Sequence, residues 1–369
     1  MSQKKYKMFV AGPVNVHDEV KDSMNYGEIG HRETEFSDLF KNIKQNFHFA
    51  FGTESKKEDY DFVVIGGSGT SATETLLSSV LHDDKKTLVI ANGAFGERIN
   101  EICELHKVPT ILLNYGWGNY PNLEEIEQRM QNNEIEAVTA VLMETSTGML
   151  NPIKKIGELC KKYEKTFIVD AVSALAGEPL NMVEDNIDYC ITNTNKTLEG
   201  LPVLGIIGYK KLTIEKSKDV KPKSYYLDFF KHVKYAEHDQ TPFTPQIPLF
   251  YMLDKALERL KEEGVQNRIS RYKRNGDLLK KTLYEIGFKP QLKENEMSNL
   301  MINVLTPKNW TYEEFHDKLK ERGYIFYPGK GELDGKVIHL ANIGTLTEED
   351  VIDFCNDIKD VIKERPIEY

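Results

Sequence analysis

A lysine and an aspartate, each placed just after a strand-like run, could do chemistry together. The run Thr166–Val169 leads directly into Asp170, and the run Asp188–Thr192 leads into a polar loop that carries Lys196. Because ligands of open α/β sheets bind at the carboxyl ends of the strands, both side chains should lie at the ligand edge. A lysine amine can form an imine with a carbonyl group, and a carboxylate can hold a proton on a ring nitrogen.

A glycine-rich turn leads from the first strand of this pattern into a helix that should run to about Leu81. Residues 66–72 have the sequence Gly-Gly-Ser-Gly-Thr-Ser-Ala. Backbone N–H groups at a helix N-terminus have no partner within the helix, and glycines let a phosphate approach them. Ser68, Gly69 and Thr70 are therefore the predicted phosphate-binding residues.

The same turn also fits a dinucleotide-binding fingerprint, through the glycines at 67 and 69 and the alanine at 72. That fingerprint requires an acidic residue at the end of the next strand, where it binds the ribose. The next strand, Thr87–Ala91, is followed by Asn92 and Gly93 and has no carboxylate at its end. A single phosphate group therefore fits the turn better than a dinucleotide.

A phosphate-binding turn, a carboxylate and a lysine at one sheet edge together match the needs of pyridoxal 5′-phosphate (PLP). Lys196 would carry this cofactor as a Schiff base. Asp170 would keep the pyridine nitrogen protonated, so that the ring accepts electrons from the substrate. Taken singly, a strand-end aspartate is more often a helix cap and a lysine a surface charge. Their occurrence together in this order favours the cofactor site.

The elements that position these residues alternate between strands and helices. Amphipathic segments such as Leu123–Met130 and Ile156–Tyr163 separate the strand-like runs. This alternation predicts an α/β protein with a mostly parallel, doubly wound sheet of seven strands. The predicted strands are Asp61–Ile65, Thr87–Ala91, Thr110–Leu113, Ala137–Leu142, Thr166–Val169, Asp188–Thr192 and Val203–Gly208.

The pattern changes after about Pro245 and predicts a second, smaller α+β domain. A long helical stretch through Leu283 is followed by apolar runs that alternate with helices. These runs, which we interpret as strands, are Leu300–Val304, Tyr324–Tyr327 and Val337–Leu340. The last helix should begin at Glu348, after a capping sequence that starts at Thr345, and end near Lys363.

The composition is that of an ordinary folded enzyme. The 369 residues include 48 basic and 58 acidic side chains, which give a net charge of -10. The sequence has no basic stripe of the kind that binds nucleic acid. No stretch has the length and hydrophobicity of a signal peptide or a membrane span, so we expect a cytoplasmic protein. The four cysteines, at positions 103, 160, 190 and 355, have no metal-ligand spacing and should be reduced and mostly buried.

Several motifs, in family order, make the chain resemble the class V aminotransferases of PLP fold type I. The resemblance covers nearly the whole chain and implies a homodimer with shared active sites. It also implies an N-terminal segment (1–20) that packs with the small domain, a PLP-binding large domain (21–260) and a small C-terminal domain (261–369). The motifs are Ala11–Val16, Ile29–Glu33, Gly67–Thr70, Asn92–Arg98, Glu144–Gly148 and Val169–Ser173.

The resemblance also implies roles for individual residues. Lys196 and Asp170 match the cofactor lysine and its acidic partner, and residues 68–70 match the phosphate turn. Phe95 falls where an aromatic ring stacks on the cofactor, and Thr145 where a hydroxyl bonds its phenolic oxygen. The remaining cofactor-binding residues would be Asn195, next to the lysine, and Thr244, which would reach the phosphate of a partner subunit.

The substrate-binding strand departs from the family pattern. An arginine that binds the substrate carboxylate is expected where this chain has His339. A histidine cannot make the planar two-pronged contact of an arginine and is only partly charged at neutral pH. Arg32, beside His31, is our candidate replacement.

Within the class, the motifs around Glu144 and Lys196 resemble the 2-aminoethylphosphonate:pyruvate aminotransferases, and Gly30-His31-Arg32 resembles the alanine:glyoxylate and serine:pyruvate branch. We therefore expect an aminotransferase whose donor is a small amine or amino acid, with 2-aminoethylphosphonate and pyruvate as the preferred pair. This would place it in phosphonate metabolism. A PLP lyase or decarboxylase on the same fold, and a binding protein without catalysis, are the alternatives. No metal is expected.

Overall fold

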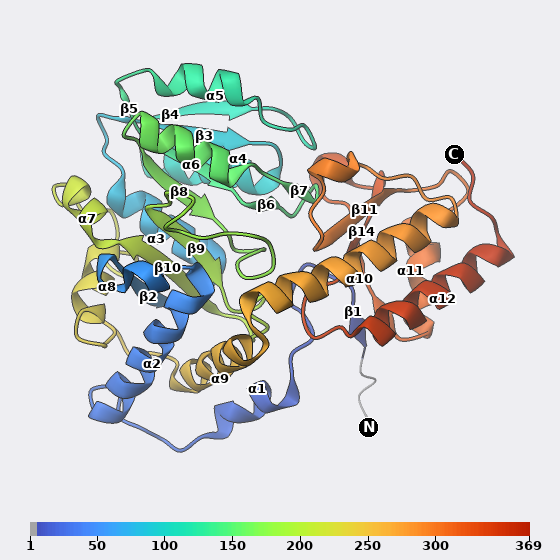
Figure 1. Ribbon diagram of the computed structural model, residues 1–369, viewed down its shortest axis with the longest axis horizontal. Helices are drawn as coiled ribbons and strands as arrows, with labels where there is room; N and C mark the ends of the chain where they lie inside the picture. Colours follow the sequence, from blue (N-terminus) through green and yellow to red (C-terminus); the bar gives the residue numbers. More distant parts are fainter. Residues whose placement is uncertain (1–5) are drawn as a thin grey trace.

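Seven hydrogen-bonded strands form the sheet around which the larger lobe is built (Figure 1). The computed structural model describes residues 6–369. The spatial order is β2-β10-β9-β8-β5-β3-β4, and only β10 runs antiparallel to its neighbours. The strands are β2 (Tyr60–Gly66), β3 (Lys86–Ala91), β4 (Thr110–Asn114), β5 (Ile135–Val141), β8 (Thr166–Asp170), β9 (Tyr189–Asn193) and β10 (Leu204–Lys210). The predicted α/β class and the seven-stranded, mostly parallel sheet are confirmed.

Helices cover both faces of this sheet. Gly205 and Gly208 of β10 point to opposite faces because they are three residues apart. A side chain at Gly205 would meet Ala72 of α3, and one at Gly208 would meet Phe51 of α2. The helices of the large lobe are α1 (Asp18–Asp22), α2 (Thr34–Phe51), α3 (Gly69–Val80), α4 (Ala94–Leu105), α5 (Leu123–Met130), α6 (Ile153–Lys162), α7 (Lys211–Ile214) and α8 (Phe229–Ala236).

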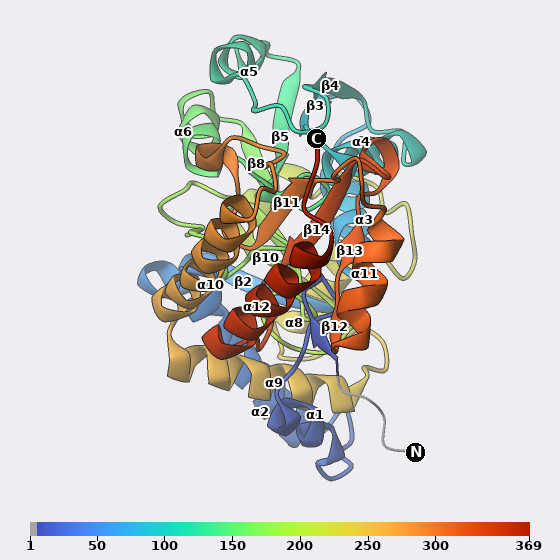
Figure 2. The same ribbon diagram turned by 90° about the vertical axis from the view of Figure 1, so that its right-hand side faces the viewer.

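The smaller lobe has its own sheet and its own hydrophobic core (Figure 2). Three antiparallel strands, in the order β11-β14-β13, pack with helices from the C-terminal part of the chain. The fold class predicted for this part is confirmed, whereas the domain boundaries stay a prediction. The elements are β11 (Met301–Leu305), α11 (Tyr312–Glu321), β12 (Tyr324–Ile325), β13 (Tyr327–Pro328), β14 (Val337–Ala341) and α12 (Glu348–Glu364).

The N-terminal segment lies against this smaller lobe. Strand β1 (Lys7–Met8) pairs in parallel with β12, and Phe9 is fully buried in the core of the small lobe. The Phe9 carbonyl accepts a hydrogen bond from the amide of Ala341 in β14. Residues 1–5 of the predicted N-terminal segment lie outside the described residues.

The long helical stretch expected after Pro245 is two helices. α9 (Ile247–Glu263) ends at Gly264, where φ is 85°, and α10 (Val265–Glu285) starts at once in a new direction. Glycine tolerates this positive φ, so the chain can turn without a loop. α10 then crosses from the large lobe into the small one (Figure 1).

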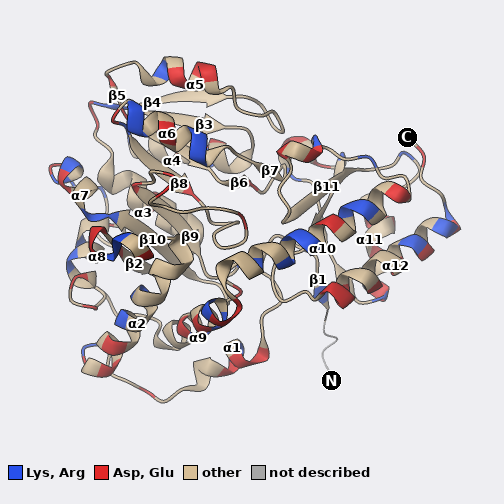
Figure 3. Cartoon of the chain, viewed as in Figure 1, with Lys and Arg blue, Asp and Glu red and all other residues tan. Residues whose placement is uncertain are grey.

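Charged residues of both signs are interspersed along α10 and α12 (Figure 3). All four cysteines are free and buried, as predicted. Within residues 6–369, no helix has the length and hydrophobicity that a membrane crossing needs.

Candidate active site

The sheet brings Asp170 and Lys196 to the same edge, as the sequence predicts. Asp170 is the last residue of β8, and the neighbouring strand β9 ends three residues before Lys196. These two strands are parallel and central, so their carboxyl ends open onto one side of the sheet. The electrostatic effect of each group on the other's pKa shows that they are close.

Asp170 is a buried carboxyl group whose ionisation the protein disfavours. Only 8% of the residue is exposed, and burial raises its pKa to about 6. The amide of Val172 donates a 2.9 Å hydrogen bond to one carboxylate oxygen, and Arg98 and Lys196 also oppose the rise. A cationic group beside this carboxylate would therefore stabilise its ionised form.

Lys196 carries an amine that is easier to deprotonate than an ordinary lysine. Burial lowers its pKa to about 8; Asp170 opposes the shift, and the nearby cations Lys330 and Arg98 add to it. A lysine needs its neutral form to attack a carbonyl carbon. At physiological pH the site therefore supplies a far larger fraction of reactive amine than a solvated lysine does.

The N-terminus of α3 faces the same region. Ser68 occupies the N-cap position without a side-chain cap bond, and its hydroxyl and that of Thr70 are exposed. The first amides of a helix have no intrahelical partner, which makes this end an anion site. A pocket joins this turn to the aspartate, and its lining includes Gly69, Thr70, Phe95, Arg98, Asp170 and Val172.

A buried glutamate holds the helix that carries Phe95. The carboxylate of Glu144 accepts hydrogen bonds from the amides of Phe95 and Gly96, at 3.2 and 3.0 Å, and from the Ser146 hydroxyl at 2.6 Å. Ser146 Oγ in turn accepts from the amide of Ala94 at 3.0 Å. The hairpin β6 (Met143–Glu144) and β7 (Met149–Leu150) thus caps α4 and fixes the aromatic ring beside the pocket.

Arg98 is a pocket residue to which sequence reasoning gave no role. Its guanidinium lies 4.7 Å from the centroid of the Phe95 ring and 3.4 Å from the hydroxyl of Thr70. The signal was present in the sequence, because residues three apart on a helix share a face and Phe95 was already a candidate. Arg98 brings a positive charge to the side of the pocket where α3 begins.

Two further candidates, Thr145 and Asn195, are polar residues next to those already described in the sequence. The Thr145 hydroxyl is buried and lies 2.5 Å from the hydroxyl of Ser173. Asn195 is partly exposed, directly before Lys196.

These features fit a PLP molecule. The helix end and hydroxyls suit its phosphate, Phe95 offers a stacking surface, and Asp170 offers an anion for the ring nitrogen. Gly69 packs closely on the loop after β8, since an added Cβ would come within 2.8 Å of Val172.

The structure does not bring Arg32 to Lys196 within one chain. The Arg32 guanidinium donates hydrogen bonds to the carbonyl oxygen of Thr241, at 2.7 Å, and to the side chain of Gln240, and it lies over the ring of Tyr235. Arg32 and Thr244 are exposed, and His31 is partly exposed. These three candidates therefore form a separate surface group.

His339 lies in the centre of the small sheet, where β14 pairs with both β11 and β13. Burial and the charge of Lys330 lower its pKa to about 4, although a hydrogen bond with the Ser146 backbone opposes the shift. Its Nε2 atom is buried without a partner in the described structure. The idea that a charged imidazole replaces the family arginine is disfavoured, because the ring is neutral at pH 7.

Comparisons with known proteins agree with this geometry. The family model described as Aminotransferase class-V matches residues 15–328. A 2-aminoethylphosphonate–pyruvate transaminase of Lysinibacillus sphaericus is 33% identical over 96% of both chains. One of Phocaeicola vulgatus is 32% identical over 97% of this chain and 99% of its own. In fold, the chain is similar to an alanine–glyoxylate aminotransferase of Nostoc sp., with a TM-score of 0.91 at 24% identity, over 98% of this chain and 96% of that one.

Proposed function

The chain belongs to the class V aminotransferases, and from that membership we propose that it transfers the amino group of 2-aminoethylphosphonate to pyruvate, with PLP bound at Lys196. The observation that carries the proposal is the pairing of a half-buried lysine, Lys196, and a buried aspartate, Asp170, at one sheet edge, next to an open helix N-terminus. The names of the two relatives at 33% and 32% identity support the substrates.

Bound PLP supplies an electron-accepting ring that stabilises negative charge at the substrate carbon next to nitrogen. In the proposed mechanism Asp170 would hold a proton on the ring nitrogen. The positive charge of the protonated ring would stabilise the ionised form of this buried carboxylate. Phe95 would pack on the ring, and Thr145 would bond its phenolic oxygen. Together these residues would orient the cofactor relative to Lys196.

Lys196 has two tasks in this proposal. Its neutral amine would hold the cofactor covalently, and its Nζ atom, when free, would serve as the general base that accepts and returns a proton of the substrate. A pKa of about 8 suits both, because a general base works best near the operating pH.

The phosphate of the cofactor is proposed to bind at the start of α3. Ser68, Gly69 and Thr70 would supply hydroxyl and amide donors, and Asn195 a further amide group. Arg98 would neutralise part of the phosphate charge from the next helix, since it already contacts Thr70. Thr244 would complete the site from a second subunit.

A homodimer explains why Arg32 and Thr244 lie away from Lys196 of their own chain. They belong to one exposed surface that also includes Tyr225, Tyr226 and Tyr235, which are 78%, 41% and 36% exposed. Exposed tyrosines are typical of protein interfaces. A second copy of the chain would cover this surface and would place Arg32 and Thr244 in the active site of its partner.

The phosphonate group of the donor needs cations, and His339 does not supply one. Lys330 lies on the turn after β13, and its charge affects the pKa values of both Lys196 and His339. Within residues 6–369 it has no ion pair. We therefore include Lys330 with Arg32 as the proposed phosphonate-binding groups, and the unpartnered Nε2 of His339 as a neutral polar contact.

A donor panel without acceptor tests this function. The purified enzyme is mixed with 2-aminoethylphosphonate, alanine, serine or taurine, and the visible absorbance of the cofactor is followed. 2-Aminoethylphosphonate should bleach the visible band fastest, and pyruvate should restore it with formation of alanine. Faster bleaching by alanine or serine would contradict the donor, and release of carbon dioxide without bleaching would instead indicate a decarboxylase.

A further inference from the structure

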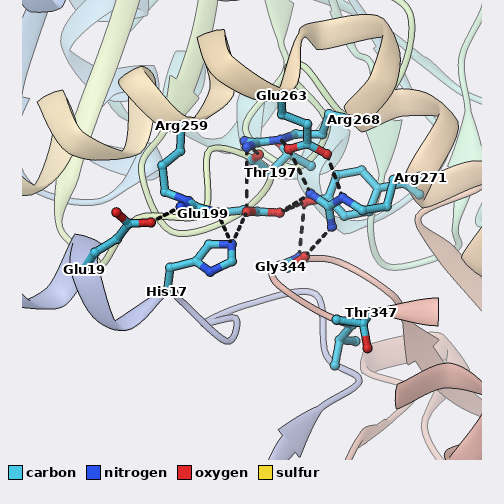
Figure 4. Close-up of polar contacts among 12 residues, drawn as sticks. His17, Glu19, Thr197, Glu199, Arg259, Glu263, Arg268, Arg271, Gly344 and Thr347 are labelled. Atoms are coloured by element: carbon cyan, nitrogen blue, oxygen red, sulfur yellow. Dashed lines mark hydrogen bonds and ion pairs between the residues drawn. The ribbon is translucent and has the colours of Figure 1, made fainter. Parts of the chain in front are cut away.

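A cluster of two acids and two arginines, partly buried, lies beside the loop that carries Lys196 (Figure 4). It consists of Glu199, Glu263, Arg268 and Arg271. Glu199 is 3% exposed and Arg268 is 1% exposed. Side chains of this kind are rarely buried so completely unless they are paired, and the proposed chemistry uses none of them.

The carboxylate of Glu199 is the centre of the cluster. Its oxygens accept hydrogen bonds from the hydroxyl of Tyr272, at 2.6 Å, and from Arg271, at 2.7 Å, and Arg268 lies at 3.7 Å. Burial works against its ionised form, but Arg268 and Arg271 outweigh burial and hold its pKa below the usual value. Glu199 is therefore an anion held by three side chains of α10.

The same residues fix the backbone around Lys196. The amide of Glu199 donates to the carbonyl oxygen of Lys196 at 2.9 Å, and Glu199 itself has a left-handed φ of 58°. Arg268 also donates to the carbonyl oxygen of Thr197 at 3.1 Å. A non-glycine residue keeps such a φ only where its surroundings enforce it, and here the bound carboxylate does so.

The cluster also reaches the small lobe. Arg271 donates to the carbonyl oxygen of Gly344 at 3.0 Å, and the hydroxyl of Tyr272 accepts from the amide of Gly344 at 3.2 Å. Gly344 follows β14, the strand of His339. One helix, α10, thus holds both the lysine loop and the end of the strand that faces the proposed substrate site.

Glu263 provides a matched comparison within the same cluster. Its carboxylate binds Nε of Arg268 and Nε of Arg271, each at 2.7 Å, from the end of α9. Within residues 6–369, its carboxylate makes no hydrogen bond or ion pair with the loop of residues 196–200. Loss of either negative charge therefore leaves the same two arginines with one acidic partner fewer. Only the loss at Glu199 also removes the carboxylate contact between the lysine loop and α10.

We propose that Glu199 is a positioning residue, which acts through α10 to hold the backbone of Lys196 in register with the cofactor and with the small lobe. This inference rests on the proposed role of Lys196. It predicts that the loop loses its geometry when Glu199 loses its charge, although Glu199 touches neither substrate nor cofactor.

The test compares Glu199→Gln with Glu263→Gln in the full-length enzyme. Three quantities are measured: the thermal midpoint of unfolding, kcat and KM for both substrates, and hydrogen exchange of the amides of residues 196–200. Both variants should lower the midpoint. Glu199→Gln should lower kcat about tenfold or more, with both KM values within about twofold. Exchange in the loop should rise by about tenfold or more in this variant, and by less than about threefold in Glu263→Gln.

Equal losses of kcat in the two variants, or an unchanged kcat in Glu199→Gln, would overturn the inference. If Glu199→Gln does not fold, Tyr272→Phe removes the hydrogen bond to Glu199, together with the one from the Gly344 amide, without unpairing a charge. It should lower kcat about threefold with KM unchanged, and a wild-type kcat would overturn the inference equally. Failure of the proposed function is distinguishable, because the exchange comparison needs no substrate and would stand even if the wild-type enzyme transferred no amino group.

Discussion

The backbone of Gly12 lies directly against the side chain of Lys196. A Cβ atom added at Gly12 would come within 2.8 Å of Cδ and 3.2 Å of Nζ of the lysine, and φ at Gly12 is 135°. The N-terminal segment, which packs on the small lobe, therefore also contacts the lysine side chain. No larger residue fits there unless the lysine moves.

Substitution of Gly12 by alanine should impair catalysis more than stability. The new methyl group would displace Lys196, and a misplacement of about 1 Å can cost roughly a hundredfold in rate. Gly335→Ala is the matched control, because φ is also positive there, at 67°, but no atom lies within 4 Å of the added Cβ. Both variants should lose about 1–3 kcal/mol of stability, yet only Gly12→Ala should lose activity. Similar kcat values in the two variants would contradict the importance of this contact between Gly12 and Lys196.

Asp170→Asn should make the cofactor-free protein more stable and the enzyme less active. The folded pKa of Asp170 is about 6, above its ordinary value of 3.8, so ionisation in the fold costs stability as pH rises through this interval. At pH 7.5 the variant should gain up to about 3 kcal/mol in urea unfolding, and the gain should disappear near pH 4. Turnover should fall at least about tenfold, because an amide cannot hold the proton on the ring nitrogen. A gain that does not depend on pH would argue against a buried charge.

His339 should act as a neutral residue throughout the physiological range. Its folded pKa of about 4 lies below the ordinary 6.5, so the unfolded chain takes up the proton first and stability falls as pH drops from 6.5 to 4. His339→Gln should remove about 3 kcal/mol of this pH-dependent loss, measured by urea unfolding at a series of pH values. Between pH 6 and 8, the KM of the donor should depend on pH in the same way in the wild type and in His339→Gln. A change of KM with pH that this variant abolishes would restore the imidazolium hypothesis.

Shared active sites predict complementation between two inactive variants. One chain carries Lys196→Ala and the other carries Arg32→Ala together with Thr244→Ala. If each site takes Arg32 and Thr244 from the partner, a mixed dimer contains one unaltered site and should recover roughly half of the wild-type activity. The same mixture remains inactive if each chain builds its site alone.

The sequence predicts the strands well because each is a short buried run with clear ends. All seven predicted strands of the large sheet lie within two residues of the observed ones at each end, and Leu123–Met130 is matched at both ends. The single strand predicted at Tyr324–Tyr327 is two strands, because β12 pairs with β1 and β13 pairs with β14. Those partners come from distant segments that local patterns do not reveal.

Asp170 and Lys196 were predictable from their positions at strand ends, but the residues that support them were not. Glu144 binds amides 48 and 49 positions away, and Glu199 binds Arg271, 72 positions away. Long-range contacts of this kind leave no periodic pattern, since a glutamate or arginine alone resembles a surface charge. The separation of Arg32 from Lys196 within one chain was equally invisible, because it depends on how the turns after β10 fold.

The most direct test of the central claim is to locate the cofactor. The enzyme with bound PLP is reduced with borohydride, digested, and analysed by mass spectrometry, with Lys196→Ala as the control. The account predicts one modified peptide, labelled at Lys196, and no labelled peptide in the variant. Labelling of another lysine, or a labelled Lys196→Ala protein with near-native turnover, would contradict it.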